Sequence, residues 1–167
     1  METDIVVGSG MKVTCTRDDL VSRLSAVSRV VSTRGAVQVL AGVLLRARDG
    51  MLELAATDME LSLRTTLPGT VEGEGDLVVH GKLFSDLARL LPDDQVTIEY
   101  RPEDGVAHLS SGAYQSRINT YAAEDFPRLP SVDVPLHAVE AASLLDTIGR
   151  VARSASRDES RPVLTGI

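Results

Sequence analysis

The stretch VLAGVLLRARDGMLELAATDMELSL, Val39 to Leu63, decides the fold. Runs rich in apolar residues flank Asp49-Gly50, and an Asp-Gly pair between two such runs is a strong signal for a two-residue hairpin turn. Pro68-Gly69 then ends the pattern, as turn residues do at the end of a strand. We therefore predict a meander of three consecutive strands, over 37–48, 51–57 and 59–67.

The same order of elements occurs twice between residues 11 and 121. In the first copy, a strand over 12–16 and a helix over 17–31 precede the meander, with Thr16 as the helix N-cap. The second copy has a strand over 76–80, a helix over 82–91, and then strands over 95–100, 106–111 and 113–121. On the second helix we expect a buried side formed by Leu83, Phe84, Leu87, Leu90 and Leu91.

These patterns predict an α+β fold, in which one domain contains two β-α-β-β-β halves with helices on one side of antiparallel sheets. The opening of the pattern then returns near the end of the chain. LSAVSRV (24–30) matches LDTIGRV (145–151), and VLAGV (39–43) matches VLTGI (163–167), with three more residues in the loop between them. Chance similarity among common apolar residues is the alternative explanation.

Between the domain and this partial copy lies EDFPRLPSVDVP (124–135), whose three prolines are typical of an extended connector. We therefore predict four segments in the chain. They are a flexible leader over 1–10, a domain over 11–123, the connector over 124–135, and a truncated start of a second domain over 136–167.

Positive charge is concentrated in the predicted helices, although the formal net charge of the chain is −7. The segments 17–34, 82–91 and 141–161 hold ten of the 17 Lys and Arg residues but only six of the 24 Asp and Glu residues. The helices are therefore basic in a protein that is otherwise strongly acidic.

The basic residues also repeat at helical spacing. Lys82 and Arg89 point nearly the same way, Arg150 and Arg153 share a face of the third helix, and Arg29 lies opposite the apolar face of the first. Cations are common on the wet side of any amphipathic helix. Three such faces together favour a curved surface that attracts a phosphate backbone without reading its sequence.

Other kinds of chemistry have little support in the sequence. Aromatic residues make up 3% of the chain and there is no Trp, which argues against a base-stacking surface. The histidines are scattered and no phosphate-binding loop occurs, so we expect neither a metal nor a cofactor. VEGEGD (71–76) is interpreted as a solvated turn. Asp58 and Glu60, placed in a strand, could share a face and bind a metal ion only with a third ligand.

Neither a membrane segment nor a secretion signal is predicted. No apolar run approaches the roughly 20 residues needed to span a bilayer. The acidic start METDIVVGSG (1–10) lacks the basic region of a signal peptide. Cys15 is the only cysteine, which indicates a reducing compartment. We therefore expect a cytoplasmic protein with no membrane partner.

Five of these stretches together resemble the bacterial DNA sliding clamp, the β subunit of DNA polymerase III. They are MKVTCTRDDL (11–20), the meander over 39–63, GKLFSDLARLLP (81–92), AAEDFPRLP (122–130) and SRDESRPVLTGI (156–167). The resemblance implies the DNA-clamp fold and a three-domain protomer. It also implies a homodimeric ring that encircles duplex DNA and tethers the replicative polymerase during DNA replication, as a non-catalytic processivity factor.

The resemblance implies particular site residues as well. Arg34 matches a DNA-contacting arginine just after the first helix, and Lys82 and Arg89 match basic positions on the second. Arg157 and Arg161 fall in the corresponding loop of the next domain. The strand that pairs with the second protomer corresponds to Ser116, Arg117 and Ile118, although Ser116 stands where an aromatic residue can be found.

The chain departs from the family in length. The rest of the second domain and the third domain are missing, and with them the pocket for polymerase and clamp-loader peptides and the other half of the ring interface. We therefore expect an incomplete N-terminal portion that does not close a ring. Two other functions stay open, namely a small metal-dependent enzyme using Asp58 and Glu60, and a protein-interaction module that never meets DNA.

Overall fold

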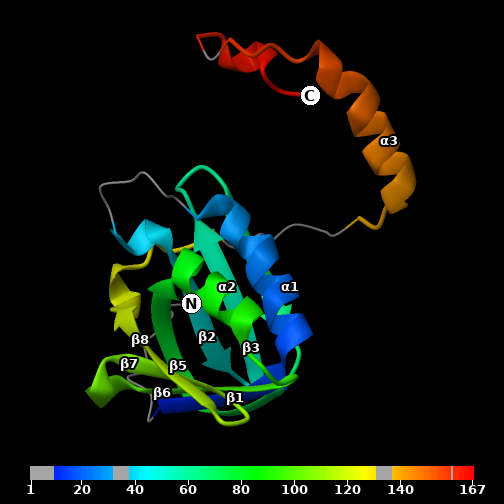
Figure 1. Ribbon diagram of the computed structural model, residues 1–167. Helices are drawn as coiled ribbons and strands as arrows, with labels where there is room; N and C mark the ends of the chain where they lie inside the picture. Colours follow the sequence, from blue (N-terminus) through cyan, green and yellow to red (C-terminus); the bar gives the residue numbers. More distant parts are fainter. Residues whose placement is uncertain (1–9, 32–37, 131–136, 159) are drawn as a thin grey trace. The chain divides into compact units, whose positions relative to one another are not determined.

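The computed structural model describes residues 10–31, 38–130, 137–158 and 160–167 (Figure 1). The chain divides into two compact units, Met1–Leu129 and Pro130–Ile167. The helix of the second unit is α3 (Ala141–Val151). The elements of the first unit are, in chain order, β1 (Gly10–Thr16), α1 (Arg17–Val27), β2 (Gly42–Arg48), β3 (Met51–Thr57), β4 (Ser62–Leu67), β5 (Thr70–His80), α2 (Gly81–Leu90), β6 (Gln95–Arg101), β7 (Val106–Ser111) and β8 (Tyr114–Tyr121).

The two predicted β-α-β-β-β halves are confirmed, and they interlock through their first strands. β1 pairs with β6 of the second half, and β5 pairs with β2 of the first, in each case antiparallel. β1 and β5 also pair with each other, from Gly10↔Glu74 to Thr14↔Thr70. The complete strand order is β1-β6-β7-β8-β5-β2-β3-β4. Each half therefore completes its sheet with a strand from the other.

The contact between β1 and β5 requires Gly73. This residue has a φ of +75°, and a Cβ atom on it would collide with the carbonyl oxygen of Gly10. We predicted a solvated turn over 71–76, and that prediction is wrong because these residues belong to β5. The glycines that suggested a turn instead allow two strands to approach closely.

Two strand starts also differ from the sequence-based prediction. Asp49 and Gly50 have φ values of +52° and +72°, as the predicted two-residue hairpin turn requires. The preceding strand, however, begins at Gly42 and not at 37, because Gln38–Ala41 forms a 3-10 turn. Val37 lies outside the described residues. The third strand begins at Ser62 and not at 59.

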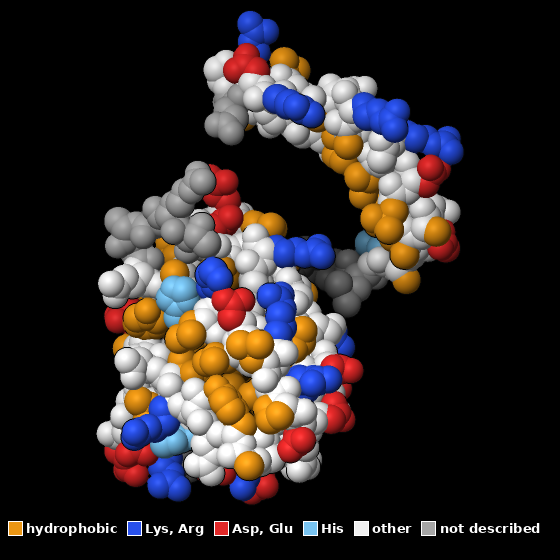
Figure 2. Space-filling view, in the orientation of Figure 1, with side chains coloured by type: hydrophobic (Ala, Val, Ile, Leu, Met, Phe, Trp, Pro, Cys, Tyr) orange, Lys and Arg blue, Asp and Glu red, His pale blue; other side chains and the backbone are white. Residues whose placement is uncertain are grey.

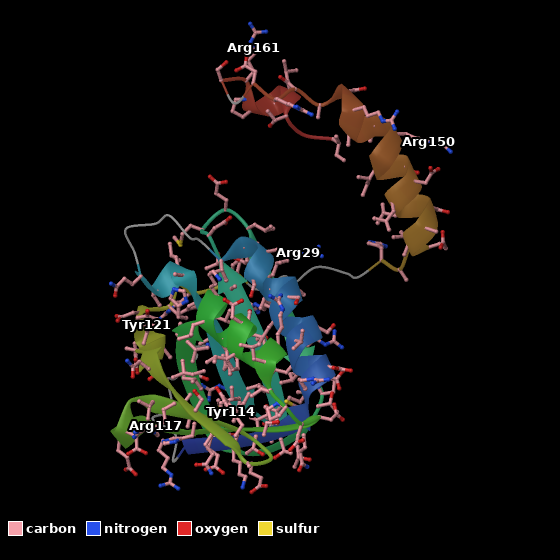
Figure 3. All side chains as sticks on the ribbon, in the orientation of Figure 1. Arg29, Tyr114, Arg117, Tyr121, Arg150 and Arg161 are labelled. Atoms are coloured by element: carbon pink, nitrogen blue, oxygen red, sulfur yellow. The ribbon has the colours of Figure 1, made fainter. Side chains whose placement is uncertain are left out.

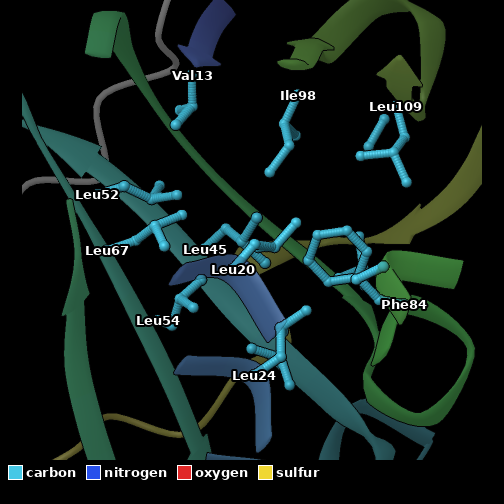
Figure 4. Close-up of a cluster of buried hydrophobic side chains, with 14 of the residues drawn as sticks. Val13, Leu20, Leu24, Leu45, Leu52, Leu54, Leu67, Phe84, Ile98 and Leu109 are labelled. Carbon is cyan, nitrogen blue, oxygen red and sulfur yellow. The ribbon is translucent and has the colours of Figure 1, made fainter. Parts of the chain in front are cut away.

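Helices α1 and α2 lie side by side over the sheet, in agreement with the predicted arrangement of helices on one side (Figure 1). α1 begins where predicted, because Thr16 Oγ1 accepts the backbone N–H of Asp19 at 3.1 Å. Leu20 and Leu24 from α1 and Phe84 from α2 enter the main core. There they meet apolar side chains from both halves of the sheet, among them Val13, Leu45, Leu52, Leu54, Leu67, Ile98 and Leu109 (Figure 4).

The buried side of α2 differs from the predicted one. Leu83 and Leu90 are 48% and 77% exposed, whereas Gly81, Phe84, Ser85 and Ala88 are buried. A Cβ atom on Gly81 would lie 3.0 Å from a methyl group of Val31, so the helix approaches the segment after α1 closely. Small residues permit this approach, and it turns two of the leucines toward solvent.

A smaller apolar cluster lies apart from the main core. Val39, Leu44, Ala55, Val78 and Phe126 are buried in it, and Leu129 packs against them. Part of the predicted connector therefore packs against the first unit, which extends to Leu129. The domain boundaries themselves stay a prediction.

The second unit repeats the local structure that follows β1. In the first unit, α1 leads into 3-10 turns at Ser28–Val30 and Gln38–Ala41. In the second, α3 leads into 3-10 turns at Ala152–Ser154 and Pro162–Leu164. These elements start 124 residues apart in all three cases. The prediction that the loop of the second copy is three residues longer is therefore wrong. With the constant offset of 124 residues, Arg29 corresponds to Arg153.

None of the helices in the described ranges has the length and apolar content that crossing a membrane would require.

A buried carboxylate joins two strands of the first unit. Asp76 on β5 lies opposite Arg46 on β2, and its side chain is only 7% exposed. One carboxylate oxygen accepts a hydrogen bond from Arg48 at 2.9 Å, and the other lies 3.4 Å from Arg46 Nε. Asp76 therefore holds two guanidinium groups at the junction of the two halves.

Replacing Asp76 by Asn should lower the free energy of unfolding by about 2–4 kcal/mol, because two partly buried guanidinium groups lose their counter-charge. Urea unfolding followed by circular dichroism measures this change. Glu74→Gln is the matched control, since Glu74 is half exposed and lies 4.0 Å from Arg48. Equal effects of the two substitutions would contradict the assignment.

Cys15 gives a second prediction. Burial, with a smaller effect of Asp19, raises the pKa of its thiol from 9.0 to about 11. The folded state therefore holds the proton more tightly than the unfolded state, and this contribution to stability should be lost as the pH rises from about 9 to 11. Urea unfolding at a series of pH values should show a steeper loss for the unmodified chain than for Cys15→Ala. Parallel curves would contradict it.

Candidate nucleic-acid interface

The first unit has a hollow of about 350 Å³ at the face where α1 and α2 meet. Figure 2 shows Lys and Arg side chains over these helices, next to an exposed apolar area. Leu83 and Leu90 of α2 are exposed. The described residues that line the hollow are three cations, three serines, one aspartate and one valine, namely Arg29, Lys82, Arg89, Ser25, Ser28, Ser85, Asp86 and Val31.

The sequence predicted the three cations of this hollow, and the structure brings them together. Lys82 and Arg89 are seven residues apart on α2, and both are exposed. Arg29 comes from the 3-10 turn that continues α1, and it is exposed as well. Their meeting depends on the packing of α2 against α1, which helical periodicity alone does not describe.

Serine hydroxyl groups lie between the cations. Ser28 Oγ and Ser85 Oγ are 3.0 Å apart, and a guanidinium nitrogen of Arg89 donates to Ser25 Oγ at 3.4 Å. Ser28 and Ser85 were not among the predicted site residues. The spacing of Gly81, Ser85 and Ala88 along α2 is the signal that could have indicated a close helix contact at this point.

Asp86 lies between the two cations of α2. Its carboxylate accepts a hydrogen bond from Lys82 Nζ at 2.7 Å and lies 3.7 Å from a guanidinium nitrogen of Arg89. The hydrogen bond from Lys82, followed by the positive charges of Lys82 and Arg89, lowers the pKa of Asp86. The carboxylate is therefore ionised near neutral pH, and it occupies part of the positive site.

The other predicted cations lie in the second unit, and all of them are exposed. Figure 3 labels Arg150 on α3 and Arg161 near the end of the chain. A guanidinium nitrogen of Arg150 lies 2.7 Å from a carboxylate oxygen of Asp146. Arg153 and Arg157 are exposed on the segment between them. A surface shared by all three helices stays a prediction, and Arg34 lies outside the described residues.

The predicted dimer edge lies on β8. Residues 114–119 of this strand pair with β7, whereas pairing with β5 involves only Tyr121 and Thr120. Within the described parts of the chain, the other side of 114–119 therefore has no partner strand. Arg117 is exposed at this edge, but Ile118 is 2% exposed and belongs to the core (Figure 3). A partner strand could contact Ile118 only through its backbone.

Asp58 and Glu60 do not form the predicted strand pair. They lie in a turn between β3 and β4, because Asp58 Oδ1 accepts the N–H groups of Glu60 at 3.0 Å and Leu61 at 2.8 Å. These hydrogen bonds lower the pKa of Asp58. In the described ranges, no three His, Cys, Asp or Glu residues are grouped so that they could hold a metal ion.

The profile of the family described as "DNA polymerase III beta subunit, N-terminal domain" matches residues 11–130. The chain belongs to this family. The match spans both β-α-β-β-β halves and the hollow between α1 and α2. The family predicted from the sequence is therefore confirmed.

Relatives in this beta subunit family are longer than the chain. It is 33% identical to the beta sliding clamp of Micrococcus luteus, over 94% of this chain and 50% of the relative. It is 34% identical to the beta sliding clamp of Streptomyces coelicolor, over 94% of this chain and 41% of that relative. The crystal structure of the Bacillus subtilis polymerase sliding clamp superposes with a TM-score of 0.85 at 27% identity, over 95% of this chain and 44% of that one. The chain thus spans half or less of these relatives.

Titration with Mg²⁺ or Mn²⁺ tests the alternative of a metal-dependent enzyme. We expect that Asp58→Ala does not abolish any saturable binding of Mg²⁺ or Mn²⁺, because the carboxylate of Asp58 accepts the backbone hydrogen bonds of the turn. We expect Asp58→Ala to weaken the fold at neutral pH, and the difference from the unmodified chain to shrink as the pH falls through the lowered pKa of Asp58. Calorimetry and thermal unfolding at several pH values measure the two effects. Saturable binding lost in Asp58→Ala would restore the enzyme hypothesis.

Proposed function

We propose that this chain forms the N-terminal portion of a sliding clamp, a ring that encircles duplex DNA and holds the replicative polymerase on it. The observation that carries the proposal is the meeting of Arg29, Lys82 and Arg89 in one hollow of a beta subunit family member. The clamp has no catalytic role of its own and increases processivity by tethering.

The chemistry of the hollow suits phosphate groups. Long exposed cations attract a phosphate backbone at any sequence, and serine hydroxyls can donate hydrogen bonds to its oxygens. Among the described residues of its lining, none has an aromatic side chain that could stack on a base. The expected contact with DNA is therefore weak, sensitive to salt and indifferent to sequence, as a ring that slides requires.

The internal repeat supports a second set of contacts. Arg153 occupies the same position after α3 as Arg29 does after α1. We infer that both arginines contact the DNA backbone. Arg34, Arg150, Arg157 and Arg161 extend the proposed contacts, in accordance with the resemblance to the family.

Ring closure requires a second protomer. The unpaired side of residues 114–119 offers backbone N–H and C=O groups to a strand from another chain. We propose that Ser116 and Arg117 contact that partner with their side chains, whereas Ile118 contributes backbone only. Contacts with the polymerase and the clamp loader are assigned to the part of the clamp that this chain does not span.

Replacing Lys82 and Arg89 together by Ala should weaken the binding of duplex DNA and reduce its salt dependence. Each lost phosphate contact lowers the log–log slope by roughly one unit, so we expect a decrease of about one to two units. Fluorescence anisotropy with a duplex of about 30 base pairs, measured from about 20 to 200 mM salt, gives the slope.

Lys12→Ala with Arg101→Ala is the matched control for this experiment. It removes the same charge, but these residues alternate with buried residues of β1 and β6 and therefore lie on the outer face of the sheet. An equal loss in both double variants would indicate a net-charge effect and contradict the site. No binding by the unmodified chain at low salt would favour the protein-interaction module.

A further inference from the structure

Asp86 is the only carboxylate among the described residues that line the hollow. It follows Lys82 by four positions and precedes Arg89 by three, so one acidic side chain can contact both cations on the same face of α2. The distances are 2.7 Å to Lys82 Nζ and 3.7 Å to Arg89. Arg29, on the opposite wall, forms no ion pair with a described residue.

A contribution to helix stability explains this arrangement poorly. Lys82, Asp86 and Arg89 are about half exposed or more, and ion pairs between such exposed side chains stabilise a helix only slightly. The position of Asp86 has a larger consequence for a ligand. A phosphate group that enters the hollow must share Lys82 and Arg89 with the carboxylate or displace it, and it is repelled by the negative charge of Asp86.

We propose that Asp86 acts as a competing anion that limits how strongly the hollow holds the DNA backbone. This inference rests on the proposed function, because it assigns to Asp86 the role of setting the strength of that contact. With Asp86 in place, two of the three cations are partly neutralised before DNA arrives, and Arg29 is the fully available one. The contact is then weak enough to break and re-form along the duplex.

The same arrangement occurs on α3 at a different position of the repeat. Asp146 precedes Arg150 by four residues, and its carboxylate lies 2.7 Å from the guanidinium group. Both partners are exposed, as on α2. Two helices of the proposed DNA-facing surface therefore each carry an acid one turn away from an exposed cation, although their sequences differ.

Asp86→Asn tests the role, because asparagine keeps the size of the side chain and removes its charge. Asp49→Asn is the matched control. It makes the same charge change in the turn between β2 and β3, at the opposite end of β2 from α2, and asparagine tolerates the positive φ of that position. Both variants are made in the 167-residue chain, with thermal unfolding as a check of the fold.

We expect Asp86→Asn to bind a duplex of about 30 base pairs roughly three- to tenfold more tightly than Asp49→Asn at low salt, with a log–log slope steeper by about one unit. The gain should vanish when Lys82→Ala and Arg89→Ala are added to Asp86→Asn. A purely structural role of Asp86 would change the melting temperature and leave the slope unaltered.

The outcomes separate this inference from the proposed function. If Lys82→Ala with Arg89→Ala lowers the slope but Asp86→Asn behaves like Asp49→Asn, the inference is wrong and the proposed function stands. If neither the unmodified chain nor any variant binds duplex DNA at low salt, both are wrong. A gain that persists without Lys82 and Arg89 would also overturn the inference.

Discussion

The exchange of strands between the two halves of the first unit is the constraint on which the rest of its structure depends. β1 pairs with β6, β5 pairs with β2, and the two first strands pair with each other. The antiparallel pairing places the end of β1 beside the start of β5, and each helix begins directly after one of these strands. α1 and α2 therefore start at opposite ends of the β1–β5 pair, and the guanidinium group of Arg17 at the start of α1 donates to the carbonyl of Leu91 after α2 at 3.3 Å. The hollow lies where the later residues of α1 and its 3-10 turn meet α2.

The contact between the helices then determines which side chains face solvent. Gly81, Ser85 and Ala88 let α2 approach the end of α1, with Ser28 and Ser85 in hydrogen-bond contact. Larger residues at these positions would separate the helices and enlarge the distance between Arg29 and the cations of α2. In the sheet, by contrast, the side chains of Arg46 and Arg48 are partly buried and lie against the buried carboxylate of Asp76. These two arginines and the exposed arginines of the hollow thus lie in different environments.

Local signals in the sequence predicted much of this structure. The Asp-Gly turn, the cap at Thr16 and the order of elements in both halves are confirmed. The errors arose where tertiary contacts overrule local preference. Glycines in 71–76 suggested a turn because their strand partner, β1, is far away in the sequence. Leu83 and Leu90 suggested a buried face of α2 that close packing against α1 turns outward.

The candidate site was predictable in part for the same reason. Lys82 and Arg89 share a side of α2 by spacing alone, whereas their approach to Arg29 and to the serines required the packing of two helices.

The interlocked sheet also has a consequence for synthesis on the ribosome. β1 emerges before β6, yet its pairing partners extend to Tyr100 on β6. Until that strand leaves the exit tunnel, the apolar faces of the nascent first half lack these partners and are prone to aggregation.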